Sequence, residues 1–263
     1  MPAPHRIVSI GCPKRRSSQP MSDHPADTRR HEPVPDERRA DAAARAIAAL
    51  LPRPGGVLLD LAGGTGAVSH RLADRHRVMV VDRTGAVLRR AAVRLPGRQV
   101  RADAARLPVR DGAADAVACV WLLHLLPPDT VAAVIGEIAR VLRPGGRFVT
   151  TVDKHFDHGT ATDVDAALEP LLVRLHGVRA SDDSARLTAL AAGHGLIPAG
   201  RTRFTGHGQG IRPGELADLL DHRYPQVPAD LLSATEAALR RLPDPDRPRA
   251  DPRYLVAAFV RPP

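Results

Sequence analysis

The stretch VLLDLAGGTGAVSHRLA, at residues 57–73, constrains the fold of this chain more than any other. It predicts a buried strand over 57–61, a turn of small residues, and a helix that begins near Ala67, with Val68 and Leu72 at helical spacing. Glycines in such a turn tolerate positive φ and let a ligand approach the backbone, while the N–H groups of a helix start face outward. The stretch therefore predicts a β–turn–α unit whose turn binds a ligand.

The spacing of the glycines argues against a nicotinamide dinucleotide, because the third glycine of G-x-G-x-x-G would fall on Ser69. The pattern instead resembles the first motif of the class I S-adenosylmethionine-dependent methyltransferases, an acidic residue followed by glycines at alternate positions. Ala62 replaces the first of these glycines, which matters only if that position needs positive φ. The resemblance implies that the cofactor S-adenosylmethionine is bound by the acid and the turn, namely Asp60, Ala62, Gly63, Gly64 and Gly66.

Two further acids follow predicted strands. Asp82 closes the apolar run 78–81, one strand–helix–strand repeat after the first acid, so both carboxylates should lie at the carboxyl edge of a parallel sheet. The resemblance implies that Asp82 accepts hydrogen bonds from the cofactor's ribose, beside Arg83; the alternative is that Asp82 caps the next helix. Asp103, after a strand at 99–102, is similar to the family's adenine-binding acid, with the N–H of Ala104 on the ring.

The residues after the fourth predicted strand, 116–122, include the candidate acid–base group. By the resemblance Val120 and Trp121 line the cofactor site, although a tryptophan there is equally expected to pack in the core. His124 stands where the family often carries a histidine facing the reaction centre, so it is the candidate catalytic base for a hydroxyl acceptor. The alternative is that its ring packs or bonds to the backbone, and His155 is the next candidate base.

The resemblance covers residues 39–206 and a last strand at 254–260. It implies an α/β, doubly wound fold with a mostly parallel seven-stranded sheet, whose last strand is antiparallel and inserted between two others. Two segments, near 156–180 and 207–252, exceed this fold and are predicted to be helical cap insertions at the carboxyl edge that shape the substrate pocket. Residues 35–263 are thus the predicted methyltransferase domain, and residues 1–34, without periodicity, a disordered tail in which Met21 is an alternative start.

Composition excludes several classes of protein. Of 38 basic residues only Lys14 and Lys154 are lysines, and aromatic residues make up 3% with the arginines scattered, so nucleic acid is not an expected partner. Two cysteines provide no disulfide framework, which fits the cytoplasm, and Cys119 is expected in the core. No stretch approaches the roughly 18 apolar residues of a membrane helix.

A metal ion is not predicted, although one segment has the residue types of metal ligands. Asp153, His155, Asp157 and His158 lie on an extended stretch, where alternate side chains point in different directions. These residues are expected to be solvated loop residues.

The function predicted from these motifs is transfer of a methyl group from S-adenosylmethionine to a small-molecule acceptor in secondary or specialised metabolism. The reaction is an in-line displacement at a sulfonium carbon, for which the protein aligns donor and acceptor and excludes water. The alternative is a non-catalytic S-adenosylmethionine-binding regulatory or partner protein, since a fold does not guarantee chemistry. The motifs indicate neither the acceptor nor the oligomeric state.

Overall fold

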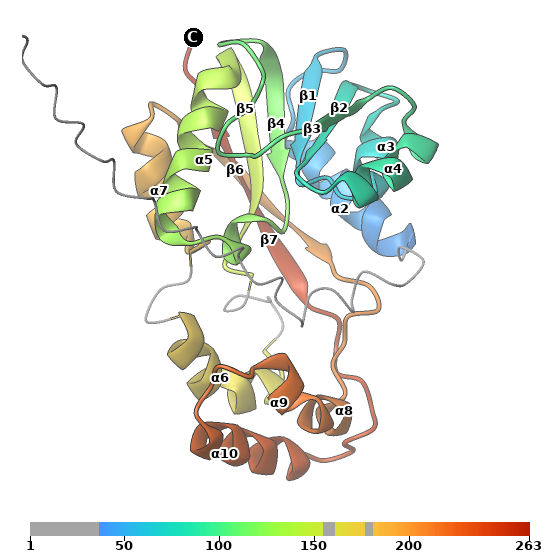
Figure 1. Cartoon of the computed structure of the whole chain (residues 1–263), viewed down its shortest axis with the longest axis vertical. Helices are drawn as coiled ribbons and strands as arrows, with labels where there is room; N and C mark the ends of the chain where they lie inside the picture. Colours follow the sequence, from blue (N-terminus) through green and yellow to red (C-terminus); the bar gives the residue numbers. More distant parts are fainter. Residues whose placement is uncertain (1–36, 155–160, 177–180) are drawn as a thin grey trace, which may run out of the picture. The chain divides into compact units, whose positions relative to one another are not determined.

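A computed structural model describes residues 37–154, 161–176 and 181–263. The chain divides after Glu32 into two units, and all the described residues belong to the second. The helices and strands, in chain order, are α2 (Glu37–Leu50), β1 (Val57–Leu61), α3 (Ala67–Leu72), β2 (Arg77–Asp82), α4 (Gly85–Arg94), β3 (Gln99–Arg101), β4 (Ala114–Cys119), the 3₁₀ turn η2 (Leu123–Leu125), α5 (Pro128–Val141), β5 (Leu142–Val152), α6 (Asp163–His176), α7 (Ser184–Gly193), β6 (Ile197–Thr205), α8 (Pro213–Asp218), α9 (Leu220–Arg223), α10 (Ala229–Arg240) and β7 (Arg253–Val260) (Figure 1).

One seven-stranded sheet has the order β3-β2-β1-β4-β5-β7-β6. The first five strands pair in parallel, and β7 runs antiparallel to both of its neighbours, β5 and β6. The predicted fold class, with its inserted antiparallel last strand, is confirmed. Because β5 and β6 are both antiparallel to β7, they run in the same direction, and their carboxyl ends lie at the edge where β1 and β4 also end.

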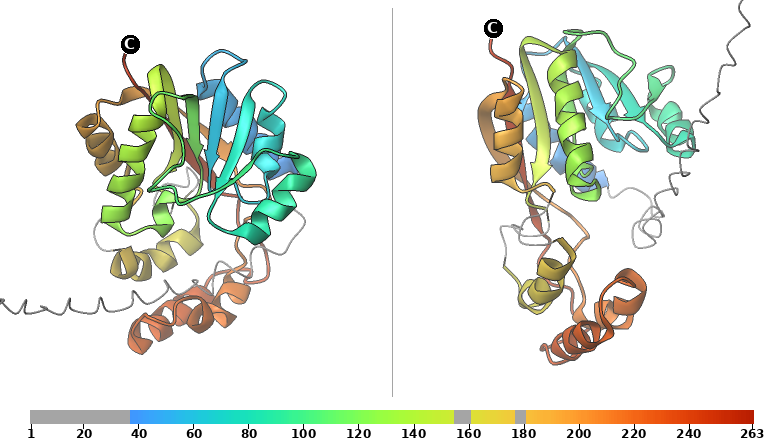
Figure 2. Two further views of the ribbon diagram at one scale, coloured as in Figure 1. Left: turned by 45° about the horizontal axis from the view of Figure 1, so that its top comes forward. Right: turned by 60° about the vertical axis from the view of Figure 1, so that its left-hand side comes forward.

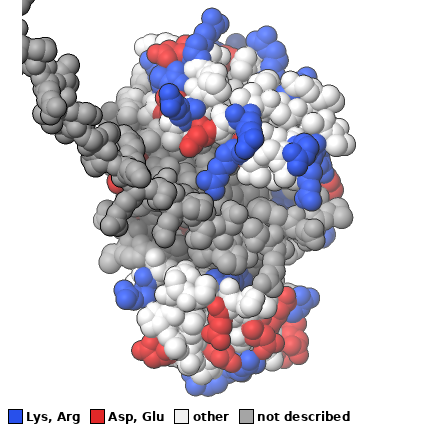
Figure 3. Space-filling view, viewed as in Figure 1, with Lys and Arg blue, Asp and Glu red and all other residues white. Residues whose placement is uncertain are grey.

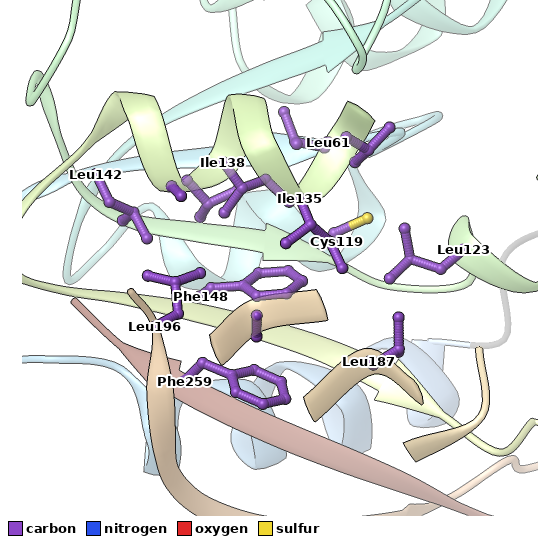
Figure 4. Packing of buried hydrophobic residues seen from close by; sticks show 14 of the residues in the cluster. Leu61, Cys119, Leu123, Ile135, Ile138, Leu142, Phe148, Leu187, Leu196 and Phe259 are labelled. Atoms are coloured by element: carbon purple, nitrogen blue, oxygen red, sulfur yellow. The ribbon is translucent and has the colours of Figure 1, made fainter. Parts of the chain in front are cut away.

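Helices cover both faces of the sheet (Figure 2). Alternate residues of β4 separate the two layers: Val117 and Cys119 pack in a cluster with residues of α5 and α7, whereas Ala116 and Ala118 pack with residues of α2. Figure 4 shows the first layer, in which Phe148 stacks on Phe259 with ring centroids 5.7 Å apart. Cys119 is fully buried there, as expected, and burial raises the pKa of its thiol.

Several boundaries differ from the sequence predictions. The fourth strand ends at Cys119 rather than at residue 122, because Trp121 has a φ of +59° and cannot continue a strand. The sequence predicts a fifth strand over 147–152, after the Pro-Gly-Gly turn, but β5 begins before this turn, at Leu142, and a register shift against β4 accommodates the extra residues. In the segment near 207–252, where the sequence predicts one helix near 214–222, the structure has two, α8 and α9, which are separated at Leu219; α7 was not predicted.

The helices α6, α8, α9 and α10 bury a separate apolar cluster that includes Leu171, Leu216 and Leu239. Helix α6 lies in the connection from β5 to β6, and α8, α9 and α10 lie in the connection from β6 to β7; both connections leave the carboxyl end of a strand. Arg249 joins these connections: its guanidinium donates to both carboxylate oxygens of Asp163, at 2.7 and 2.8 Å. The predicted tail, 1–34, lies outside the described residues.

Candidate functional site

The turn after β1 has the backbone of a ligand-binding loop. Ala62, Gly64 and Gly66 all have positive φ, at +56°, +56° and +72°. A Cβ on Gly63 would lie 2.8 Å from Oδ2 of Asp60, so only glycine fits there. A Cβ on Gly64 would meet nothing closer than 3.9 Å among the described residues, which leaves the space over the turn open to a ligand.

Ala62 therefore occupies a position that requires positive φ. Its replacement of the family's glycine matters for this reason. Its N–H donates to the carbonyl of Val81 at 2.7 Å, so the conformation is fixed by the neighbouring strand. An alanine in this region of φ and ψ is strained relative to glycine.

Asp60 lies beneath the turn. Its side chain is buried and accepts a hydrogen bond from the hydroxyl of Ser69, in α3. Burial raises its pKa to about 6, while the Ser69 bond lowers the pKa and the negative charge of Asp82 raises it. Asp60 therefore ties the end of β1 to the first turn of α3 and supports the backbone of the turn.

Asp82, at the end of β2, reaches the same turn. One of its carboxylate oxygens accepts from the N–H of Thr84 at 2.8 Å, and the other accepts from the N–H of Gly64 at 3.3 Å. The N-cap residue of α4 is Thr84 and not Asp82, so the bond to Thr84 lies just before the helix. The contact with Gly64 places the carboxylate of Asp82 at the glycine turn. Arg83 is exposed beside it.

Asp103 follows β3, the next strand outward from β2. Its carboxylate is exposed and accepts a hydrogen bond from the N–H of Ala105 at 2.9 Å, while its carbonyl accepts from Arg106 at 3.0 Å. These two bonds form a local turn that holds Ala104 against the core. Three acids thus lie near the carboxyl ends of neighbouring strands: Asp60 within β1, Asp82 at the end of β2 and Asp103 after β3.

Val120 and Trp121 follow β4 and are partly buried against the layer that contains α2. The indole ring lies edge-on to Phe204 and Tyr254, with centroid distances of 5.5 and 5.8 Å. The N–H of Trp121 donates to Oγ1 of Thr151 at 2.9 Å. These contacts are the core packing that was the alternative for this tryptophan.

His124 lies in η2, which follows Trp121 in the chain, and its side chain is only 8% exposed. Its Nε2 lies 2.7 Å from Nζ of Lys154, which follows β5. The N–H of Lys154 donates to a carboxylate oxygen of Asp182, a fully buried residue whose pKa is raised by burial. His155 lies outside the described residues.

Three residues of this region were not singled out as site residues. Ser69 was noted only as a missing glycine, although a serine facing a buried acid is a recognisable hydrogen-bond pair. Lys154 carried a signal in the composition, as one of two lysines among 38 basic residues. Asp182 carried none, because nothing local distinguishes a buried loop aspartate from an exposed one. In the described part of the chain no three residues of the metal-ligating types cluster; His155, Asp157 and His158 lie outside it.

Comparisons with known proteins agree with this geometry. Residues 59–150 match the model of a family described as a methyltransferase domain. No curated protein matches the sequence.

Among solved structures, the chain is similar to the YcgJ protein of Bacillus subtilis, with 16% identity, a TM-score of 0.56 and coverage of 86% of this chain and 98% of that one. Geranyl diphosphate C-methyltransferase of Streptomyces coelicolor, solved with S-adenosylhomocysteine, has 16% identity, a TM-score of 0.52 and coverage of 84% and 77%. The 1,6-didemethyltoxoflavin-N1-methyltransferase of Burkholderia thailandensis, also solved with S-adenosylhomocysteine, has 18% identity, a TM-score of 0.53 and coverage of 87% and 80%.

These structures share the fold, and the family model covers the strands from β1 to β5. Together, the family model and the sheet order show that residues 59–150 lie in a methyltransferase domain with a Rossmann-like fold. Within the described ranges, none of the helices has the length and apolar character needed to cross a membrane.

Proposed function

We propose that the protein transfers a methyl group from S-adenosylmethionine to a small-molecule acceptor in secondary or specialised metabolism. The observation that carries the proposal is the convergence of Asp82 on the N–H of Gly64, which brings an acid and an open glycine turn together at the carboxyl edge of the sheet. When bound, the cofactor supplies an electrophilic methyl group on a sulfonium. The fold supplies its position and orientation.

The residues around the turn have the chemistry to hold this cofactor. Asp82 would accept hydrogen bonds from the ribose hydroxyls, and Asp103 and the N–H of Ala104 would meet the adenine. Asp60 acts from below by fixing the turn, since it is buried under Gly63. The remaining proposed contacts are Ala62, Gly63, Gly64, Gly66, Arg83, Val120 and Trp121.

A small acceptor is supported by the solved relatives and by the chain's own topology. Two of the solved relatives were crystallised with small molecules, geranyl diphosphate in one and 1,6-didemethyltoxoflavin in the other. In this chain the helical segments α6 and α8 to α10 lie on connections from the carboxyl edge, where a cap over an acceptor would be inserted. His124 and His155 remain the proposed bases for an acceptor that must lose a proton.

The proposed setting is the cytoplasm, without nucleic acid or membrane as partner. On the face in Figure 3, basic side chains are scattered among acidic and neutral ones rather than gathered in one stripe. A nucleic-acid substrate would favour a continuous basic surface.

The cofactor assignment is tested by calorimetry with S-adenosylhomocysteine. Asp82→Ala should weaken binding by tens-fold, because it removes a charge-assisted hydrogen bond of about 1.5–3 kcal/mol. Asp74→Ala is the matched control, since it removes an exposed aspartate between α3 and β2, at the amino end of the sheet. Equal affinity in the folded Asp82→Ala protein, or no binding by the unmodified protein, would refute the assignment.

The acceptor is sought by screening small molecules for release of S-adenosylhomocysteine. Turnover with one compound class is the expected result. Cofactor binding together with an absence of turnover across chemically diverse acceptors would favour the non-catalytic alternative.

A further inference from the structure

A lysine contacts a buried histidine at the carboxyl edge of the sheet. Nζ of Lys154 lies 2.7 Å from Nε2 of His124, and the two residues follow the adjacent strands β5 and β4. His124 is 8% exposed, whereas Lys154 is only partly buried. Of the two side chains, the lysine is therefore the more accessible to a bound acceptor.

The segment 181–184 fixes both partners. Asp182 accepts from the N–H of Asp153 through its carbonyl, at 3.0 Å, and from the N–H of Lys154 through its carboxylate, at 2.9 Å. Ser181 donates to the carbonyl of Leu123, next to the histidine, at 3.0 Å. The same short segment thus forms hydrogen bonds with the backbone of Lys154 and with η2, which contains His124. These bonds limit how far the two side chains separate.

Within the described residues, two titratable groups contact or interact with Lys154. His124, in η2, contacts its Nζ, and Asp182, before α7, interacts with its charge and accepts from its backbone N–H. Asp182 is fully buried; burial raises its pKa, the charge of Asp153 raises it further, and the charge of Lys154 opposes this shift. The lysine ammonium donates only, so in that state Nε2 of His124 must accept and the ring carries its proton on Nδ1.

The choice of lysine at this position is informative in this chain. Of its 38 basic residues, all but Lys14 and Lys154 are arginines. An arginine would supply positive charge and hydrogen-bond donors, but its guanidinium does not release a proton, whereas a lysine amine does so when its surroundings favour it. A lysine beside a histidine therefore provides a proton-exchanging pair that an arginine does not.

We propose that Lys154 takes the proton from the methyl acceptor in place of a histidine base, and that His124 is the positioning residue behind it. This inference rests on the proposed function. The acceptor's lone pair bonds to the methyl carbon, and the carbon–sulfur bond breaks with its electron pair left on sulfur. The acceptor's proton passes to the neutral lysine amine, which becomes an ammonium and donates to Nε2 of His124.

The pair is tested without cofactor or acceptor by NMR of the protein labelled with ¹³C at lysine Cε. Two lysines give two signals, and Lys154→Arg assigns them. The Lys154 signal should show a pH-dependent step that depends on its contact with His124, and His124→Gln should abolish this step. His76→Gln, at another buried histidine, is the matched control and should leave the step unchanged. A Lys154 signal that is insensitive to His124→Gln would overturn the proposal.

The proton role is tested by turnover with the acceptor that the screen identifies. Lys154→Met and Lys154→Arg should each lower turnover by about 10²–10⁴-fold, with S-adenosylhomocysteine affinity within a few-fold of the original. Near-normal turnover of Lys154→Arg would show that only charge is needed, and would overturn the proposal. Failure of the proposed function gives a different result from failure of the Lys154 proposal, because the unmodified protein would then not bind S-adenosylhomocysteine.

Discussion

Replacing Ala62 with glycine should stabilise the protein, because the native backbone at this position is left-handed. The φ of +56° is imposed by the turn and by the bond from the Ala62 N–H to the Val81 carbonyl. An L side chain in this region costs about 1–2 kcal/mol relative to glycine. Glycine keeps the same N–H, so the hydrogen bond survives the substitution.

Two opposing effects reduce the gain. Glycine loses more conformational freedom on folding, which costs about 0.4–1 kcal/mol. The methyl group of Ala62 is partly buried, and its loss costs at most about 0.4 kcal/mol, half the value of a fully buried methylene. The net expectation for Ala62→Gly is a gain of about 0.5 kcal/mol in the free energy of unfolding, or about 1–2 °C in Tm for a folded unit of this size.

Urea unfolding measures this difference, and Gly97→Ala is the matched control. Gly97 has a φ of +72°, and a Cβ there would meet nothing within 4 Å, so that variant measures the cost of left-handed alanine alone. It should lose about 0.5–1 kcal/mol. If Gly97→Ala destabilises as expected while Ala62→Gly is also less stable than the original, the methyl of Ala62 makes a packing contribution that outweighs its strain, and the reasoning fails.

Three further expectations concern pH, the helical segments and the tail. Because the pKa of Asp60 is raised from 3.8 to about 6 in the folded protein, the folded state retains this proton longer, so this residue's contribution falls as pH rises from about 4 to 6. Between pH 4 and 6, the free energy of unfolding of Asp60→Asn should therefore rise relative to that of the unmodified protein by up to about 3 kcal/mol. If the two proteins show the same pH dependence in unfolding experiments, the assignment is wrong. Arg249→Lys should speed amide hydrogen exchange in α6 but leave β1 to β5 unchanged, since lysine does not reproduce the two-pronged contact with Asp163; equal exchange in α6 would mean that the contact contributes nothing. A chain that begins at Met21 should unfold at the temperature of the full chain and bind S-adenosylhomocysteine equally, and a Tm lower by several degrees would show that the tail packs on the domain.

The elements that depend on local sequence were predicted closely. β1 has the predicted bounds and α3 begins at Ala67, because an apolar run, a turn of small residues and a helical spacing are all complete within a few residues. The positions of Asp82 at the end of β2 and of Asp103 after β3 follow from the same repeat, since parallel strands place their carboxyl ends at one edge. The antiparallel last strand, inserted between two others, was implied by the resemblance and not by any periodicity in the strands, and the structure confirmed it.

The sequence by itself determined the strand–turn–helix unit and the acids near the ends of successive strands, and these motifs indicated the methyltransferase resemblance. Each of these features depends on residues that are close together in the chain. Only the tertiary structure decided the positive φ of Ala62 and Trp121, which neighbouring strands impose. It alone decided the contact between His124 and Lys154, which are 30 residues apart and meet because β4 and β5 are adjacent. Side-chain partners across such a separation depend on the register of the sheet and the packing around it, and no local pattern encodes either.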